Sequence, residues 1–476
     1  MALLDAPAPP TESDEGRPDP APPGANRVLA LSTFAFTLLF AAWLMFGVLG
    51  VPIRDELGLS DVQLSWLSAV AILNGSIWRL PAGIAADRWG GRVVFTFFLL
   101  TTAVFSYLVA QVHSYGTLLV LAFLVGLAGN AFTAGVAWNS AWFPRERQGF
   151  ALGLFGAGNV GASVTKFLGP AVIGATAGGT YLGFVDGGWR LVPVIYAVLL
   201  AVTAVALWLL VPRHDRSPGR GRSIREQLVP LREVRVWRFS SYYVAVFGAY
   251  VALAAWLPKY YVDTFGVSLT TGALLTATFI FPASLLRPVG GALSDRIGAR
   301  RVMYWTFGVM LAATALLMMP NGHIVVEVSG NNGTADVLPF AMSLELFVVT
   351  VFVLGCAMGI GKAAVYKHIP EYFPRDVGAV GGLVGMLGGL GGFLLPPLFA
   401  YATSWTGLPS ATFFVLFVLT AVCFAWMHRT VLALLQHESP ELSDHFEHPH
   451  LPGRRLGRRA HFDPAGAAGT TMEANR

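Results

Sequence analysis

The chain has 476 residues, of which 55% are hydrophobic and 12% are charged. Soluble domains usually carry about 25% charged residues, so this composition excludes an ordinary soluble protein and is typical of a membrane protein. The net charge of +5 and the pI near 9.3 indicate contact with anionic lipid. Nucleic acid is the alternative partner for the basic residues, and we disfavour it because membrane topology already explains them.

Residues 1–27 are predicted to form a disordered cytoplasmic tail. The first 26 residues contain seven prolines and five acids, a composition that cannot bury a hydrophobic core. They also lack the short apolar stretch after a basic start that marks a secretory signal peptide.

Twelve apolar stretches follow, each of about twenty residues, which is the length that a helix needs to cross a hydrocarbon core about 30 Å thick. They cover residues 28–50, 63–86, 92–112, 116–142, 149–173, 190–211, 238–261, 270–294, 301–320, 338–366, 378–401 and 409–432. The sequence therefore predicts an all-α membrane protein with twelve transmembrane helices. Cys356 and Cys423 fall inside predicted spans, where we expect packing roles rather than a disulfide or a metal site.

The basic residues outside the spans predict the orientation. Most of the 32 Lys and Arg fall on one side, and Arg54, Arg190 and Lys259 are the three on the other. Because Lys and Arg accumulate on the cytoplasmic side, we expect both termini in the cytoplasm and the chain in a bacterial inner membrane. Residues 321–337 form the one sizeable outer loop. The tail at 435–476 holds five of the ten histidines and is predicted to be disordered rather than metal-binding.

An internal repeat divides the spans into two halves. Residues 79–92 (RLPAGIAADRWGGR) and 287–300 (RPVGGALSDRIGAR) share six residues at an offset of 208, and each run closes an even-numbered span. A second pair, at 143–161 and 373–392, starts with Phe-Pro-Arg and continues into a glycine-rich span. We therefore predict a six-helix half at 28–211, a basic cytoplasmic linker at 212–237 and a second six-helix half at 238–434. Many secondary transporters use duplicated halves of this kind for alternating access.

Arg79 and Arg287 are the residues most indicative of function. Each lies eight residues before a repeated aspartate, which places it about 12 Å into the membrane at 1.5 Å per residue. A lone arginine there costs about 2.5–3.5 kcal/mol, and spans one to nine and eleven offer no acid at this depth. We expect the pair to face a central cavity and to bind a small planar anion, because a guanidinium presents paired N–H donors to a flat oxyanion. An ion pair with a buried acid is the alternative. The chemistry alone admits nitrate, nitrite, formate, bicarbonate or a small carboxylate.

The run from Gly83 to Arg92, Gly-x-x-x-Asp-Arg-x-Gly-x-Arg, resembles the loop 2–3 motif of the major facilitator superfamily, and the second half carries a second copy. Arg79, Arg287 and the glycine-rich runs of spans five and eleven resemble the nitrate/nitrite porter family within it. The resemblance implies the major facilitator fold over residues 28–432 and a secondary transporter of nitrate or nitrite, working by nitrate/proton symport or nitrate/nitrite exchange. The sequence has no metal-ligand cluster, phosphate loop or nucleophile–base arrangement, so we expect no enzyme activity and no cofactor. We expect membrane lipid as the surroundings and a monomer as the functional unit. A transporter of another small organic anion, or an anion sensor, is the alternative.

The same resemblance implies which residues contact the substrate. In the family, the asparagine equivalent to Asn159 contacts the substrate, and a buried amide can donate hydrogen bonds to an anion. The other expected contributors are glycines and aromatic residues: Gly158, Gly388, Phe46, Phe132, Tyr243 and Phe247. For these residues, helix packing or contact with lipid is the alternative role.

Charged residues near the cytoplasmic ends of the spans are expected to hold that face shut. They are Asp87, Arg88, Arg92, Asp295, Arg296, Arg300, Arg145 and Arg375. We expect Asp87 and Asp295 to pair with Arg88, Arg92 or a neighbouring helix, and Arg145 and Arg375 to be further partners.

Symport requires a group that titrates, and arginine does not deprotonate in proteins. Lys362, Lys166 and Glu345 are the candidates within the spans. For Lys362 and Lys367, the alternative is that the long side chain reaches the cytoplasmic surface.

Overall fold

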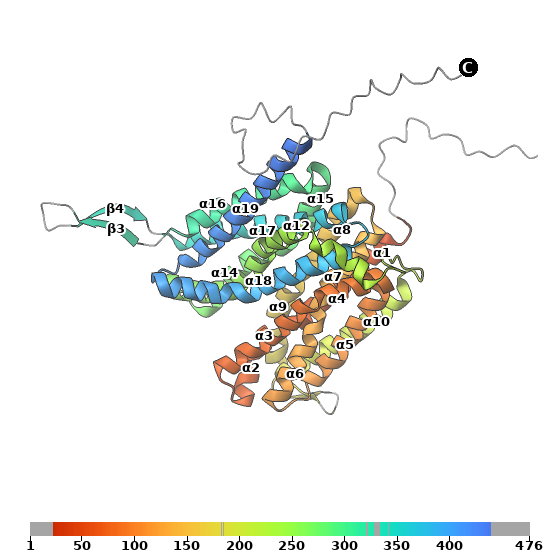
Figure 1. Cartoon of the computed structure of the whole chain (residues 1–476). Coiled ribbons are helices and arrows are strands. Elements are labelled where there is room, and N and C mark those ends of the chain that lie inside the picture. The colour runs from red at the N-terminus through yellow and green to blue at the C-terminus, as the bar shows by residue number, and fades with distance from the viewer. Residues whose placement is uncertain are drawn as a thin grey trace, which may run out of the picture. The chain divides into compact units, whose positions relative to one another are not determined.

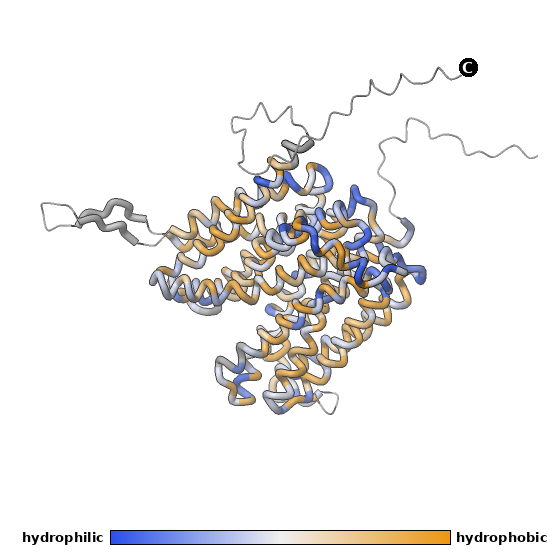
Figure 2. Tube along the Cα trace, viewed as in Figure 1, coloured by the Kyte–Doolittle hydropathy of each residue, from blue (hydrophilic) through white to orange (hydrophobic). Residues whose placement is uncertain are grey.

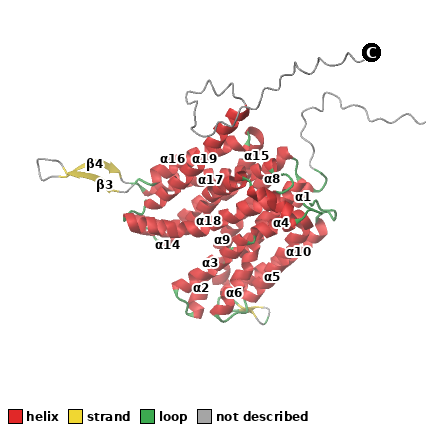
Figure 3. Cartoon of the chain, viewed as in Figure 1, coloured by secondary structure: helices red, strands yellow, loops and turns green. Residues whose placement is uncertain are grey.

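The structure, a computed structural model, describes residues 22–438 apart from residues 182, 184, 320–321, 328–333 and 341. The described part is almost entirely helical (Figure 3). Most of the two predicted tails, including the histidines beyond 438, therefore lies outside the described residues. The chain divides into two compact units, Met1–Ala425 and Trp426–Arg476, and all contacts given below lie within the first.

The six predicted spans of the first half all fall on helices. The first two spans are α1 (Ala25–Trp43) with α2 (Phe46–Leu57), and α3 (Asp61–Ile77) with α4 (Arg79–Trp89). The third and fourth are α5 (Gly91–Val109), and α6 (Tyr115–Val125) with η1 (Gly126–Asn130) and α7 (Ala131–Trp142). The fifth and sixth are α8 (Arg145–Gly156) with η2 (Ala157–Val160) and α9 (Gly161–Thr176), and η3 (Gly188–Arg190) with α10 (Leu191–Leu210). The short strands β1 (Thr180–Tyr181) and β2 (Val185–Asp186) pair between them.

The second half repeats this plan. Its first two spans are α12 (Val234–Tyr243) with η5 (Val244–Gly248) and α13 (Ala249–Phe265), and α14 (Leu269–Leu285) with α15 (Arg287–Ile297). The remaining helices are α16 (Ala299–Leu317), α17 (Leu344–Tyr372), α18 (Val377–Thr406) and α19 (Ala411–Glu438). The predicted start of the tenth span at 338 is wrong, because β3 (Gly322–Glu327) and β4 (Thr334–Phe340) pair as an antiparallel hairpin before the helix begins.

The hydropathy of these helices suits a membrane. Among the described residues, nine helices are long and apolar enough to cross one, or ten if the bent pair Ala69–Ile77 and Arg79–Trp89 forms one span. Figure 2 shows hydrophobic residues along the helices and hydrophilic residues gathered at their ends and in the turns. Cys356 and Cys423 are both free in the structure, and Cys423 is buried.

The two halves interlock through the repeated motifs (Figure 1). The glycine-rich helix of each half packs on the arginine-bearing helix of the other: α8 on α15, and α18 on α4. A Cβ on Gly83 would clash with the carbonyl oxygen of Gly378, and a Cβ on Gly149 would clash with that of Gly291. Small residues of this kind let two helices approach closely within a membrane.

Two of the helical spans are interrupted near this interface. The 3₁₀ segment η2 separates α8 from α9 and carries Asn159, and the π-helical segment η5 separates α12 from α13 and carries Phe247. Local departures from α-helical geometry are frequent at functional positions, because they change the direction in which side chains project.

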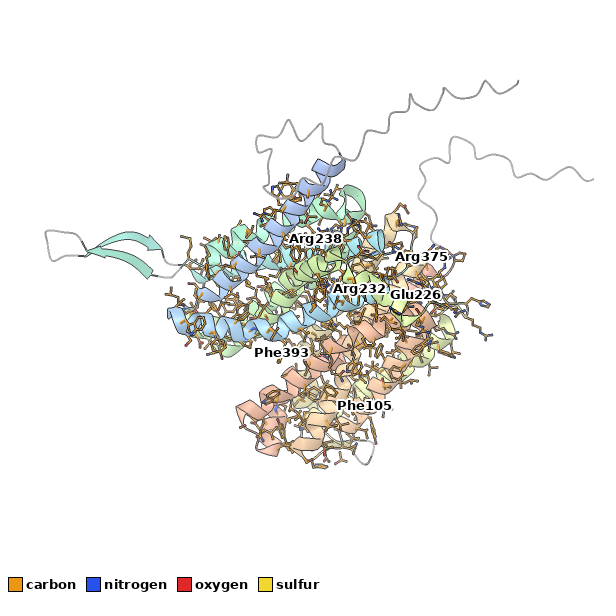
Figure 4. The ribbon with its side chains drawn as sticks, in the orientation of Figure 1. Phe105, Glu226, Arg232, Arg238, Arg375 and Phe393 are labelled. Atoms are coloured by element: carbon orange, nitrogen blue, oxygen red, sulfur yellow. The ribbon has the colours of Figure 1, made fainter. Side chains whose placement is uncertain are left out.

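The linker is packed on both halves. It contains the short helices α11 (Ile224–Leu228) and η4 (Val229–Arg232). Asp215 accepts hydrogen bonds from the indole N–H groups of Trp138 at 2.8 Å and Trp142 at 3.0 Å. Arg222 forms an ion pair with Asp376 at 2.6 Å, just before α18. Figure 4 shows Glu226 and Arg232 of this segment, with Arg375, at the same end of the helices.

Candidate anion-binding site

Arg79 and Arg287 begin α4 and α15, each directly after a one-residue break in its two-part span. Their exposed fractions are 0% and 1%, so neither side chain faces lipid or water. Among the residues that the structure describes, no carboxylate lies within ion-pair distance of either guanidinium. The alternative of an ion pair with a buried acid is therefore wrong for the described chain.

The hydrogen bonds of the two guanidinium groups are incomplete. Arg79 donates from Nε to the carbonyl oxygen of Gly75 at 2.8 Å and from Nη1 to that of Gly385 at 2.9 Å. Nη2 of Arg79, and Nε and Nη1 of Arg287, have no partner in the described structure. Buried cations with free donors are costly, so these atoms are suited to hold an anion.

Each arginine also lies against a glycine of the opposite half. A Cβ on Gly156 would come within 2.5 Å of Cζ of Arg287, and a Cβ on Gly385 would come within 3.3 Å of Cδ of Arg79. Gly156 and Gly385 occupy corresponding places in the two glycine-rich repeats. The arrangement around each arginine is thus built twice, once from each pairing of helices.

Aromatic rings enclose the two arginines. The ring centroid of Phe132 lies 5.7 Å from Cζ of Arg79 and 5.1 Å from Cζ of Arg287, so this ring touches both groups. Phe247 lies 5.5 Å from Cζ of Arg79 and stacks on Tyr243 with a centroid distance of 4.9 Å. Cation–π contacts stabilise a cation without neutralising it, so the positive charges remain available to a ligand. We call Arg79, Arg287 and these three rings the arginine cluster.

Two polar side chains, one in the cluster and one on η2, have no hydrogen-bond partner in the described chain. Asn159 lies three residues after Gly156, is 1% exposed, and has both Nδ2 and Oδ1 free. The hydroxyl group of Tyr243 lies beside the charge of Arg287 and makes no hydrogen bond of ordinary geometry. A buried polar group left without a partner costs about 1–3 kcal/mol, which indicates that a ligand or water completes this site.

The two predicted glycines lie in different surroundings. Gly388 packs directly on the ring of Tyr243 and so forms part of the wall of the cluster. Gly158 faces Phe36 and Thr37 of α1 instead. The structure therefore brings Gly388 to the cluster and gives Gly158 a place in helix packing.

Phe46 lies outside the cluster, and two aromatic residues that sequence reasoning missed lie against it. Phe46 is buried at the start of α2, and no ring contact between it and the cluster is found in the described part of the chain. Trp43 takes the expected place, 5.5 Å from Cζ of Arg79. Tyr366 meets Phe132 edge to face at 5.0 Å. Tyr366 follows Lys362 by one helical turn, and this spacing could have pointed to it.

The repeated aspartates bind the backbone of the opposite half. Oδ2 of Asp87 accepts a hydrogen bond from the N–H group of Gly378 at 2.8 Å, near the start of α18. Asp295 accepts hydrogen bonds from the N–H groups of Gly149 at 2.9 Å and Phe150 at 2.8 Å on α8. The sequence offered Arg88, Arg92 or a neighbouring helix as partners of the two aspartates, and the structure shows the neighbouring helix in both cases. We call these two cross-half contacts the lock.

The arginines expected in the lock lie elsewhere or contribute only their backbone. Arg92 donates to the carbonyl oxygen of Trp208 at 2.5 Å and lies 4.1 Å from its ring centroid, within the first half. Arg145 and Arg375 are exposed, and their carbonyl oxygens accept hydrogen bonds from Lys367 and Arg222. Within the described ranges, no ion pair is found for the remaining three, Arg88, Arg296 and Arg300.

Lys367 supplies a cation that the sequence did not assign to the lock. It pairs with Asp295 at 2.8 Å, and the two side chains are only 4% and 8% exposed. It also donates a hydrogen bond to the carbonyl oxygen of Arg145 in the other half. The alternative that Lys367 reaches the surface is therefore wrong.

The three candidates for proton coupling differ in burial and in their distance from the arginine cluster. Lys362 is 0% exposed, and its Nζ lies 3.4 Å from the ring centroid of Tyr250, so the alternative that it reaches the surface is also wrong. Lys166 and Glu345 are exposed. Glu345 lies in the first turn of α17, where an acid stabilises the positive end of a helix. Of the three, Lys362 alone lies beside the arginine cluster.

Comparisons with known proteins bear on the family and the fold of this chain. A sequence profile described as Major Facilitator Superfamily matches residues 31–326 and 261–459. The "Probable nitrate/nitrite antiporter NarK1" of Thermus thermophilus is 66% identical over 439 residues, which cover 92% of this chain and 98% of that protein. The "Nitrite extrusion protein" of Bacillus subtilis is 29% identical over 406 residues, which cover 84% of this chain and 94% of that protein. The crystal structure of the transporter FucP in the outward conformation matches with a TM-score of 0.64 at 16% identity, over 84% of this chain and 97% of that one. The major facilitator fold predicted from the sequence is confirmed, while nine or ten of the twelve predicted spans meet the length and hydropathy of a membrane helix among the described residues.

Proposed function

This chain belongs to the nitrate/nitrite porter family of the major facilitator superfamily, and from this premise we propose that it moves nitrate and nitrite across a bacterial inner membrane by alternating access. The observation that carries the proposal is the pair Arg79 and Arg287. These two buried guanidinium groups come from the two halves, keep free donors, and have no carboxylate partner in the described chain.

Nitrate and nitrite suit the chemistry of the cluster. Both are planar monovalent oxyanions, and a guanidinium matches the edge of such an anion with two parallel N–H donors. Nη2 of Arg79, Nε and Nη1 of Arg287 and Nδ2 of Asn159 are the free donors. The surrounding rings of Phe132 and Phe247 exclude water, which strengthens each charge interaction. A bound anion would satisfy the donors and neutralise one of the two positive charges.

The lock supplies the conformational part of the cycle. Asp87 and Asp295 tie each arginine-bearing helix to the glycine-rich helix of the other half. The basic linker lies at the same end of the helices, so we assign this end, with both termini, to the cytoplasm. The lock then holds the cytoplasmic side closed and breaks when the halves rock. One chain contains the whole cluster, which makes the monomer the transporting unit.

Exchange of nitrate for nitrite is the simplest mode that the cluster supports. The empty cluster carries two unpaired guanidinium groups and would resist reorientation, whereas either anion removes one positive charge. Exchange therefore needs no group that titrates. Proton-coupled symport is the second mode, and it needs such a group.

Counterflow in proteoliposomes tests the proposal. Vesicles that contain the protein and are loaded with nitrite should take up labelled nitrate from outside, and vesicles loaded with chloride should not. Excess formate or bicarbonate should compete weakly; strong competition by either would favour a transporter of small carboxylates. Binding of nitrate without any counterflow would favour an anion sensor and contradict transport.

A further inference from the structure

Lys362 is a third buried cation beside the arginine cluster, and exchange of anions does not use it. Its side chain is 0% exposed, and its Nζ has no hydrogen-bond partner in the described structure. Nζ lies 3.4 Å from the ring centroid of Tyr250 and 6.0 Å from that of Phe247. Since Phe247 also lies 5.5 Å from Cζ of Arg79, Lys362 and Arg79 share one aromatic wall.

The groups that face Lys362 from the surrounding helices include no acid within the described residues. Arg287 on α15 is the charged group whose field acts on Lys362. Tyr250 on α13 lies under Nζ, and its hydroxyl group hydrogen-bonds to Ser284 on α14 at 3.1 Å. The other titratable or polar groups nearby are Tyr243 on α12, Tyr366 on α17 and Thr306 on α16. The next charged groups along α15 and α17 are Asp295 and Lys367, and they pair with each other.

An ammonium group at this position would be the third positive charge in a buried cluster. Leaving a buried charge without a partner costs several kcal/mol, and repulsion from Arg287 adds to that cost. Two states avoid it: a neutral amine while the cluster is empty, and an ammonium group once an anion has entered. The face of Tyr250 favours the ammonium group, because an aromatic ring attracts a cation.

We propose that Lys362 takes up one proton when the anion binds, so that nitrate and a proton occupy the cluster together. This inference rests on the proposed function and names the group that its second mode, proton-coupled symport, needs. The lone pair on Nζ accepts a proton from water, the nitrate keeps its charge, and no bond to nitrate forms. Because the coupling is reciprocal, a proton on Lys362 strengthens anion binding by the same factor as the anion strengthens proton binding.

Proton uptake during nitrate binding tests the inference. Purified full-length protein in weakly buffered detergent solution, with a pH indicator dye, is titrated with sodium nitrate. We expect about one proton per bound nitrate, and a Kd for nitrate that rises about tenfold per pH unit where Lys362 starts neutral. Lys362→Met should bind nitrate without taking up a proton, and its Kd should not follow pH in this way. Lys259→Met, which removes an exposed lysine paired with Asp263, should behave as the unchanged protein does.

A second variant covers the case in which Lys362→Met does not fold. Lys362→Arg keeps a cation that does not release its proton, so it should bind nitrate without proton uptake. Proton uptake that persists in Lys362→Arg would overturn the inference. Nitrate binding by the unchanged protein without proton uptake, at every pH at which it stays folded, would also overturn it and leave the anion site intact. A complete lack of nitrate binding would instead overturn the proposed function.

Discussion

Replacing Asp295 with asparagine should open the lock, and it should do so more than the same change at Asp87. The carboxylate of Asp295 accepts two backbone hydrogen bonds from α8 and pairs with Lys367 at 2.8 Å, with both side chains almost fully buried. Asp87 accepts one hydrogen bond from Gly378, and none of the ion pairs found in the described chain includes it. Asparagine keeps one acceptor oxygen but loses the negative charge.

The expected effects differ because one change leaves a buried cation without a partner. Removing one member of a buried ion pair costs about 3–5 kcal/mol, since the other member stays buried and unpaired. About 3 kcal/mol corresponds to more than about a hundredfold in an equilibrium between two states. Asp87→Asn weakens one hydrogen bond, by about 1 kcal/mol, which corresponds to about fivefold.

Distances between spin labels measure the opening. Labels at Arg147 on α8 and Arg296 on α15, both exposed, report on the closed end in a cysteine-free background. In Asp295→Asn, the population with the longer distance should dominate, whereas Asp87→Asn should shift it slightly. Asp263→Asn, which removes an exposed ion pair, serves as the control. An unchanged distance distribution in Asp295→Asn would refute the assignment of Asp295 to the lock.

Three further changes test the site and the opposite end of the first half. Gly156→Ala would place a Cβ within 2.5 Å of Cζ of Arg287, so displacement of the guanidinium should weaken nitrate binding at least about tenfold in calorimetry. Asn159→Ala removes one buried donor and should raise the Kd for nitrate by about tenfold without lowering the amount of protein in the membrane. Partial burial raises the pKa of Glu56, but the hydrogen bond at 2.5 Å from Arg190 and the charge of Arg190 outweigh this and bring the pKa below its ordinary value of 4.5. The stability from this pair is therefore present at neutral pH and is lost as the pH falls through the pKa of the folded state. Glu56→Gln should lower Tm at neutral pH. Because the variant lacks this pair at every pH, its Tm should fall less than that of the unchanged protein between neutral and acid pH.

Each of these tests has a clear opposite outcome. Gly116→Ala, where a Cβ meets nothing within 4 Å, is the matched control for Gly156→Ala, and equal nitrate affinity in both variants would contradict the close contact with Arg287. An unchanged Kd in Asn159→Ala would argue against a ligand contact. An unchanged Tm of Glu56→Gln at neutral pH would show that its pair with Arg190 adds no stability.

Much of the fold could be predicted because its causes are local in the sequence. The length of each apolar stretch determines where a span lies, and the repeated motifs around Arg79 and Arg287 reveal the duplication. The same duplication indicated that the two arginines would face each other across the halves. The hairpin at 322–340 was missed because its apolar residues extended the predicted tenth span toward the N-terminus.

The parts of the site that could not be predicted depend on helix rotation and on contacts between distant segments. Gly156 and Gly158 are two residues apart, yet one meets Arg287 and the other meets α1, because residues two apart on a helix face different directions. The segment η2 changes this rotation further. Burial of Lys367 follows from its pairing with Asp295, which lies 72 residues earlier and comes close only in the folded chain.

Binding of nitrate to purified variants of the two arginines tests the central claim most directly. Arg79→Lys and Arg287→Lys keep a positive charge but lose the planar pair of donors. Calorimetry should show at least about a tenfold loss of nitrate affinity in each, while Arg27→Lys, at an exposed position on α1, should bind as the unchanged protein does. Undiminished affinity in either site variant would contradict the claim that the two guanidinium groups hold the anion together.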